Sequence, residues 1–255
     1  MNILGLRKEY PWKIVSIEEE SGLTSVITLE PKFNKRFTFL PGQGAFFNFP
    51  KIRGLWKPRF FHFTSAPASA PVIEITVKAV DDWTHRVSLL EEGDIALCSK
   101  ATGNFLGHED FSAREKRFVF FAGGIGINPF ISILSHLALT NSNCKILLIW
   151  SANNREDLYH KETLKNISET MPFFNIIPFL THDPMWKGEK SRISEDKLRI
   201  LIPEFFGFNE DSWLWDGPAT GYWINGPASF SEEIKNILKR MGVSSRNIRV
   251  EKIRK

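Results

Sequence analysis

Cysteine is scarce in this chain of 255 residues, and its scarcity limits the metal chemistry that the sequence allows. The two cysteines, Cys98 and Cys144, lie far apart and form no CxxC pair. An iron–sulfur cluster normally requires four cysteines, and a structural zinc site needs more His and Cys ligands than this spacing offers. The sequence therefore predicts no metal site, and we interpret both cysteines as core residues.

Runs of basic residues are also missing. The net charge of +4 and the isoelectric point near 9.0 come from charges spread along the whole chain. No lysine or arginine run is long enough to suggest an arm that binds nucleic acid, so nucleic acid is not an expected partner. The mild positive excess favours a small acidic protein as a partner instead.

Targeting and membrane-spanning segments are not expected either. The apolar stretch from Phe118 to Leu139 is long enough to span a bilayer, but Gly-Gly-Ile-Gly-Ile-Asn-Pro sits in its middle, and Arg117 and His136 flank or interrupt it. The N-terminal sequence MNILGLRKEYPWK lacks the long apolar region of a signal peptide. We therefore expect a cytoplasmic protein without a transmembrane segment.

The first half of the chain consists of short alternating or apolar runs separated by turn residues, which is typical of β-strands. Six such runs without long helices between them predict a small antiparallel barrel. One short helix is expected from about Asp82 to Leu90, because Val87 and Leu90 lie three residues apart. The expected strands are Trp12–Glu18, Thr24–Leu29, Ala45–Phe49, Arg59–Thr64, Val72–Lys78 and Asp94–Ser99.

After Ala113 the pattern changes to strands that alternate with helices, which predicts a parallel sheet covered on both faces. The polar connector Ser112–Lys116 marks the boundary, and we expect two domains, 1–113 and 114–255. The stretch Leu201–Thr220 is aromatic and is left unassigned. The expected strands are Phe118–Ala122, Lys145–Trp150, Asn175–Leu180, Tyr222–Asn225 and Ile248–Ile253, and the expected helices are Pro129–Leu139, Glu156–Thr170, Glu195–Ile200 and Phe230–Met241.

A glycine-rich turn lies between the first strand and the first helix of the second half. Gly123, Gly124 and Gly126 follow a short buried strand, and Asn128 and Pro129 mark the start of the helix, since proline fits a first helical turn. Glycines let a phosphate approach the backbone, and a helix start offers free N–H groups and the positive end of its dipole. The pattern suggests diphosphate binding, although the spacing GGxG is also plain connection geometry.

A second informative stretch, RFFHFTSAP, begins at Arg59 in the first half. An arginine, an aromatic residue two positions on and a small polar cluster at a strand end can place a charge at a phosphate and a ring against a flat heterocycle. A strand with Phe60 and Phe63 facing a core would look similar.

Together these stretches resemble the ferredoxin–NADP reductase-like flavoenzyme family, over nearly the whole chain. The resemblance implies a flavin-binding barrel followed by a nicotinamide-nucleotide domain, in a stand-alone reductase without an iron–sulfur domain. It implies that hydride passes from NAD(P)H to FAD and that electrons leave for a separate acceptor, such as ferredoxin, flavodoxin, free flavin, ferric iron or a partner redox protein. The matching stretches are FLPGQGAFF (39–47), RFFHFTSAP (59–67), ITVKAVDDWTHRV (75–87), FAGGIGINPFISIL (121–134), WKGEKSRI (186–193), INGPASF (224–230) and VEKI (250–253).

In the barrel, the resemblance implies that Arg59 binds the flavin phosphate, that Phe61 lies against the isoalloxazine ring and that Ser65 closes the site. His62 stands near flavin N5, where the family usually has Ser or Thr, and an imidazole titrates near neutral pH. A packed histidine without a catalytic role is the alternative.

The resemblance also places the flavin pyrophosphate at the turn before the short helix, where the amides of Trp83 and Thr84 and the Thr84 hydroxyl would meet it. Asp81 stands where relatives often have glycine, and its carboxylate would repel a diphosphate unless it caps the helix. Gly103 resembles a turn beneath the flavin and equally suits a purely structural role.

In the second half, the resemblance implies that Gly123, Gly124 and Gly126 hold the nicotinamide dinucleotide's diphosphate. Asn128 replaces a common threonine. Gly226 and Pro227 resemble the Cys-Gly-Pro turn that seats the nicotinamide, with Asn225 in the cysteine position, and Glu251 matches an acidic residue near the chain end or is merely a solvated charge. His62, Asn225 and Glu251 are therefore the expected catalytic residues.

The choice between NADH and NADPH is only weakly specified. No acidic residue directly follows Trp150 to grip a ribose diol, while Ser151, Arg155, Lys190 and Arg192 are candidates for a 2′-phosphate or for ordinary surface residues. NADPH is slightly favoured. A nucleotide-binding regulatory or interaction subunit, with Asp81, His62 and Asn225 marking lost chemistry, is the alternative function.

Overall fold

The first half of the chain forms the expected antiparallel barrel. A computed structural model of the chain describes residues 9–21, 23–32, 36–52, 58–87, 89–103, 105, 116–207 and 220–251. Six strands pair in the order β4-β3-β6-β1-β2-β5, and the end strands meet because Phe63 pairs with Ile75. The strands are β1 (Tyr10–Ser21), β2 (Thr24–Pro31), β3 (Gly44–Asn48), β4 (Arg59–His62), β5 (Ile73–Lys78) and β6 (Ile95–Cys98).

Aromatic side chains fill the barrel. Trp12, Phe47 and Phe63 are fully buried in one apolar cluster. The short helix α1 (Asp82–Val87) covers one opening, because Trp83 and Val87 belong to the same cluster. Burial of such large rings is a major source of stability in a small barrel.

The second half forms a five-stranded parallel sheet in the order β11-β10-β7-β8-β9. Helices separate the strands along the chain, as expected for right-handed crossovers. The strands are β7 (Arg117–Gly123), β8 (Lys145–Ala152), β9 (Phe174–Leu180), β10 (Thr220–Asn225) and β11 (Ile248–Val250), and the helices are α2 (Asn128–Leu139), α3 (Lys161–Thr170), α4 (Glu195–Phe206) and α5 (Ala228–Arg240).

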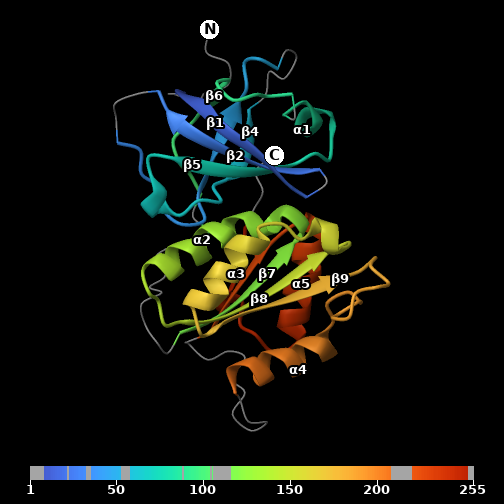
Figure 1. The fold of residues 1–255 in the computed structure, drawn as a ribbon. Helices are drawn as coiled ribbons and strands as arrows, with labels where there is room; N and C mark the ends of the chain where they lie inside the picture. Colours follow the sequence, from blue (N-terminus) through green and yellow to red (C-terminus); the bar gives the residue numbers. More distant parts are fainter. Residues whose placement is uncertain are drawn as a thin grey trace.

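Helices cover both faces of this sheet, because its central strand is apolar on both sides (Figure 1). Phe120 packs in one cluster with residues of α2 and α3, whereas its neighbour Phe121 packs in another with residues of α4 and α5. Successive side chains of a strand point to opposite faces, so a continuous apolar run is what a doubly covered strand requires.

The strand register brings the carboxyl ends of β7, β8 and β10 to one edge. Ala122 pairs with Trp150 on one side and with Asn225 on the other. The residues that follow, Gly123, Ser151 and Gly226, therefore emerge together at this edge. Ligands of parallel α/β sheets bind beyond such carboxyl ends.

The largest differences between the expected elements and the structure are in two helices. The helix expected over Glu156–Thr170 begins only at Lys161, because Asn154 accepts the amides of Glu156 and Asp157 and forms a short 3₁₀ turn instead. The helix expected over Glu195–Ile200 continues to Phe206 despite Pro203, and so takes up part of the stretch 201–220 that was left unassigned. Residues 208–219 and the expected boundary between 113 and 114 lie outside the described residues.

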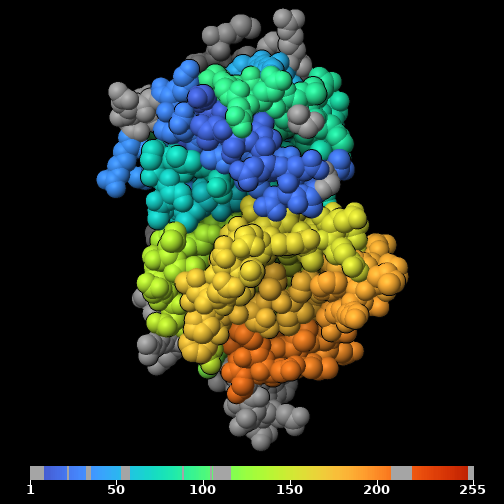
Figure 2. Space-filling model, viewed as in Figure 1, coloured from blue at the N-terminus to red at the C-terminus, as the bar shows by residue number. Residues whose placement is uncertain are grey.

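The barrel is stacked on the α/β domain, next to α2 (Figure 1). The space-filling view in Figure 2 shows the two domains touching along a broad front. Ser132 of α2 donates to the carbonyl of Ser65 at 2.7 Å, and Asn128 donates to the carbonyl of Thr76 at 3.0 Å. Among the described residues, no helix is long and apolar enough to cross a membrane.

Candidate functional site

The glycine turn after β7 has one open position and two closed ones. A Cβ on Gly126 would lie 2.2 Å from the carbonyl oxygen of Asn225, and one on Gly123 would lie 2.8 Å from the ring of Phe230. Gly124 instead has φ +53°, and a Cβ there would meet nothing within 4 Å. Packing therefore explains Gly123 and Gly126. Gly124 faces open space, where a ligand can approach the protein backbone.

The turn after β10 packs directly against this glycine turn. Asn225 is only 1% exposed, and its Nδ2 donates to the Gly126 carbonyl at 2.8 Å. Its Oδ1 is buried and has no hydrogen-bond partner among the described residues. Gly226 allows the close approach, since its Cβ would lie 3.0 Å from the Gly123 Cα, and Pro227 precedes the start of α5.

His62 and Glu251 lie at the same junction, although they come from opposite domains. The Nε2 atom of His62 is buried without a hydrogen-bond partner among the described residues and lies 3.8 Å from Oε1 of Glu251. The amide of Glu251 donates to the carbonyl of Ile224, the residue before Asn225. The fold thus gathers the three expected catalytic residues around the edge where β10 ends.

Phe61 and Trp83 form an aromatic wall on the barrel side. Phe61, on β4, is partly buried, and its ring centroid lies 5.7 Å from that of Trp83. Trp83 is 6% exposed and packs into the barrel core, and the Arg59 guanidinium lies 4.9 Å above its ring. A flat heterocycle stacked on such a wall is a chemically reasonable ligand.

The expected phosphate-binding groups are occupied by a carboxylate. Nη1 of Arg59 lies 2.6 Å from Oδ2 of Asp81. The amide and hydroxyl of Thr84 both donate to Oδ1 of Asp81, at 2.9 and 2.8 Å. Asp81 therefore caps α1, as its sequence position allowed, and also pairs with the arginine expected at the phosphate.

Three other predicted residues make structural contacts. The hydroxyl of Ser65 accepts the amide of Glu74 at 3.0 Å, which fixes the turn after β4. Asn128 is 4% exposed and bridges the domains through Thr76. Gly103, at φ +110°, accepts a hydrogen bond from Gln43 through its carbonyl.

The candidates for a 2′-phosphate are spread over the open edge. Ser151 pairs with Gly123 in the sheet, and Arg155 follows in the next turn. Asp183 binds Arg155 at two points, Oδ2 to Nε at 2.7 Å and Oδ1 to Nη2 at 3.1 Å, and this arginine lowers the pKa of Asp183 to about 2. Lys190 donates to a backbone carbonyl, and Arg192 is exposed.

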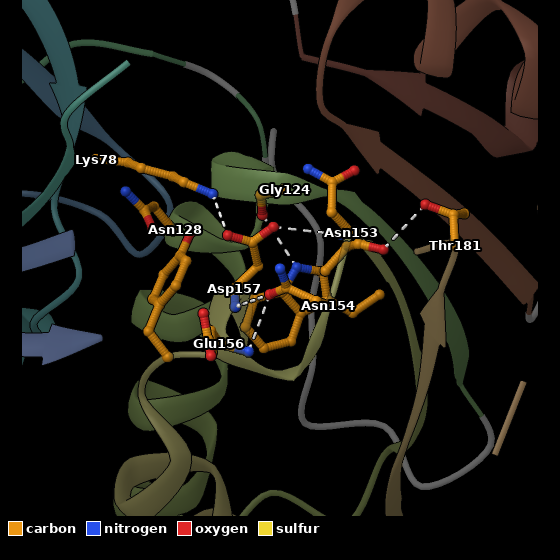
Figure 3. Close-up of polar contacts among 11 residues, drawn as sticks. Lys78, Gly124, Asn128, Asn153, Asn154, Glu156, Asp157 and Thr181 are labelled. Carbon is orange, nitrogen blue, oxygen red and sulfur yellow. Dashed lines mark hydrogen bonds and ion pairs between the residues drawn. The ribbon is translucent and has the colours of Figure 1, made fainter. Parts of the chain in front are cut away.

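Sequence reasoning missed a polar seam between the domains, shown in part in Figure 3. Lys78 of β5 reaches Asp157 at 2.5 Å, and Thr76 lies 2.7 Å from Nε2 of His160. Asp157 also accepts the amide of Asn153 at 3.3 Å. The partners are about eighty residues apart in the chain, and no local pattern predicts such a contact.

These observations fit a flavin and a nicotinamide nucleotide. Oδ1 of Asn225 and Nε2 of His62 are buried polar atoms without a hydrogen-bond partner among the described residues, and such atoms normally find partners. Gly124 leaves open space on the α/β domain, and Phe61 and Trp83 form an aromatic wall on the barrel. Among the described residues, no group of three His, Cys, Asp or Glu side chains could hold a metal ion.

The fold joins an antiparallel barrel to an α/β domain with a parallel sheet. Residues 120–230 match the family model described as "Oxidoreductase NAD-binding domain". The ferredoxin NADP⁺ reductase of Neisseria gonorrhoeae, solved with bound FAD and NADP, superposes with a TM-score of 0.78 at 23% identity, over 96% of this chain and 98% of that one. The Amycolatopsis cytochrome P450 reductase superposes with a TM-score of 0.77 at 21% identity, over 96% of this chain and 70% of that one.

Curated relatives of the sequence are longer. The chain is 23% identical over 246 residues to the "Anthranilate 1,2-dioxygenase electron transfer component" of Acinetobacter baylyi, over 94% of this chain and 65% of the relative. It is 25% identical to the phenol 2-monooxygenase reductase component of a Pseudomonas species, of which it spans 53%. The chain thus shares the fold of the ferredoxin NADP⁺ reductase named above, and residues 120–230 carry the match to the NAD-binding family model.

Proposed function

We propose that this chain is an FAD-dependent NAD(P)H oxidoreductase that takes a hydride from NAD(P)H onto FAD and passes electrons to a separate acceptor. The observation that carries the proposal is the meeting of His62, Asn225 and Glu251 beside the open Gly124 position. In this proposal the barrel of residues 1–113 binds FAD, and residues 114–255 bind the nicotinamide nucleotide.

Each residue has a role that its position supports. Phe61 stacks on the flavin, and His62 offers its unpartnered Nε2 toward the reacting edge, next to Glu251. Asn225 holds the Gly126 carbonyl with its amide and leaves Oδ1 to accept a hydrogen bond from the nicotinamide carboxamide. The bound cofactors supply the hydride chemistry itself, so the protein's task is orientation and exclusion of water.

Anaerobic reduction tests the proposal directly. The protein reconstituted with FAD is expected to be yellow and to bleach when NADPH or NADH is added without oxygen, which is measured by the visible absorbance of the flavin. Protein that takes up neither FAD nor another flavin on reconstitution, or a bound flavin that neither nucleotide reduces, would favour a regulatory or interaction subunit instead.

The acceptor is proposed to be a small acidic redox protein in the cytoplasm. The relatives named above are electron-transfer or reductase components of oxygenases, and the chain's net charge of +4 favours an acidic partner.

NADPH is the proposed donor, and Arg155 provides the test. Arg155 follows β8 at the nucleotide edge, and half of its side chain is exposed even though Asp183 binds it. We expect Arg155→Ala to raise the KM for NADPH about tenfold and to leave the KM for NADH nearly unchanged, because only NADPH carries the 2′-phosphate that the guanidinium would bind. Steady-state kinetics with both nucleotides measures this.

Lys165→Ala is the matched control, because Lys165 is exposed on α3 and its loss removes the same charge. An equal rise in both KM values for Arg155→Ala would mean that the residue only supports its loop through Asp183.

A further inference from the structure

Asp81 holds the groups that would otherwise meet a flavin phosphate. Its Oδ2 pairs with Nη1 of Arg59 at 2.6 Å, and its Oδ1 accepts both the amide and the hydroxyl of Thr84. The Thr84 hydroxyl is further committed, since it also accepts the amide of Val80 at 2.9 Å. The Asp81 carboxylate thus binds both Arg59 and Thr84, the two residues of this region that could bind an anion.

Asp81 carries its charge at neutral pH and is within reach of solvent. Burial works against its ionisation, but the hydrogen bond from the Thr84 amide and the pairing with Arg59 together lower the pKa of Asp81. The side chains of Asp81 and Arg59 are 44% and 39% exposed. Exposed ion pairs of this kind are weak and exchange partners readily. A phosphate can therefore displace Asp81, but it must compete with it.

We propose that Asp81 sets flavin affinity: its carboxylate competes with the flavin phosphate for Arg59 and Thr84, so that the flavin is held mainly by its ring and exchanges with solution. This inference rests on the proposed function and adds to it the class of flavin that binds. FAD, FMN and riboflavin then bind with similar affinity, because the phosphate-bearing part of the first two adds little binding free energy. The flavin behaves as a diffusible partner of the protein rather than as a tightly retained prosthetic group.

A competing interpretation gives Asp81 the opposite effect. The carboxylate would then hold the Arg59 guanidinium over Trp83, where it lies 4.9 Å from the ring, in the orientation that a phosphate needs. Removal of the charge would weaken the binding of phosphorylated flavins under this interpretation, whereas our proposal predicts tighter binding. The sign of the effect decides between the two.

Flavin titrations of Asp81→Asn, followed by quenching of flavin fluorescence, provide the experiment. Asparagine is as good a helix cap as aspartate, so the variant keeps the Thr84 hydrogen bond and removes only the charge. We expect the Kd of FAD and FMN to fall about tenfold and that of riboflavin to change less than about twofold, because only the first two carry phosphate. Addition of Arg59→Ala should cost more affinity for FAD in the Asp81→Asn background than in the unmodified protein.

Asp82→Asn is the matched control, because Asp82 carries the same charge one residue away and pairs with Arg86 at 2.9 Å instead of Arg59. It should leave all three dissociation constants unchanged. Unchanged or weaker FAD binding by Asp81→Asn, or an equal gain with Asp82→Asn, overturns the role of Asp81 and leaves the proposed function standing. If no flavin binds to either protein, both the proposed function and this inference fail.

Discussion

Replacing Gly124 with valine is expected to abolish reduction of the flavin by NAD(P)H, by about 100-fold or more, while flavin binding is retained. Gly124 has φ +53°, a conformation that strains a β-branched residue, and its Cβ direction is open. Valine would either project into the space that the diphosphate needs or change the shape of the turn. The proposed flavin contacts lie on the barrel, so the dissociation constant of FAD should not change. Anaerobic stopped-flow reduction and flavin titration measure the two effects.

Gly207→Val is the matched control for backbone strain. Gly207 has φ +69° and also has nothing within 4 Å of its Cβ position, but it ends α4, on the side of the sheet away from the barrel (Figure 1). Both variants should lose stability, by roughly 1–2 kcal/mol. Only Gly124→Val should lose reduction. Equal loss of reduction in both variants would mean that general destabilisation, and not the nucleotide site, accounts for the result.

Gly123 and Gly126, on either side of Gly124, show how much of the glycine turn could be predicted from the sequence. The pattern correctly predicted a turn between strand and helix, but it treated Gly123, Gly124 and Gly126 alike. The structure separates them, because Gly123 faces the ring of Phe230 and Gly126 faces the backbone of Asn225. These neighbours lie about a hundred residues further along the chain, where only the sheet register brings them near.

Secondary structure followed from local periodicity to within a few residues, and the exceptions have local causes. Asn154 captures the amides of Glu156 and Asp157, which delays α3, and the chain turns through a left-handed residue at His160 before the helix starts. Asparagine favours such caps and turns, but the sequence alone does not show which amides its side chain accepts.

The pairing of Asp81 with Arg59 could be predicted only in part. Asp81 caps α1 by accepting the amide of Thr84, which lies only three residues further along the chain, so the sequence could predict this contact. The bond to Arg59 depends on how α1 sits against β4, which only the assembled barrel determines. The same limit applies to the seam between the domains, where Lys78 meets Asp157.

Acid is expected to destabilise the protein below pH 6.5 through His160, a residue of that seam. His160 is 4% exposed, and burial lowers its pKa to about 4. Unfolded histidine has a pKa near 6.5, so between these values the unfolded chain binds more protons and stability falls as the pH falls. The contribution at pH 5 is about 2 kcal/mol. Denaturant unfolding at pH 7 and pH 5 measures the change.

His160→Asn isolates this contribution. Asparagine tolerates the left-handed backbone at this position, where φ is +56°, and cannot take up a proton. The variant should lose about 1 kcal/mol at pH 7, since the contact with Thr76 is lost. Its stability should fall less between pH 7 and pH 5 than that of the unmodified protein, by about 2 kcal/mol.

Two carboxylates, Glu20 and Glu74, act in the opposite sense as the pH falls. The acid response is therefore measured as the difference between His160→Asn and the unmodified protein. Oε1 of Glu20 lies 3.8 Å from Nδ1 of His160 and favours its charged form. Burial, and then the nearby Glu18 and Glu20, raise the pKa of Glu74, whose protonation therefore stabilises the fold as the pH falls. Glu74 remains in His160→Asn, so its effect cancels in the comparison, whereas the attraction of Glu20 for charged His160 is lost with the histidine and is part of the measured difference. His182→Asn, at an exposed histidine, should keep the full acid sensitivity; an equal reduction there, or none in His160→Asn, would show that His160 does not carry the acid response.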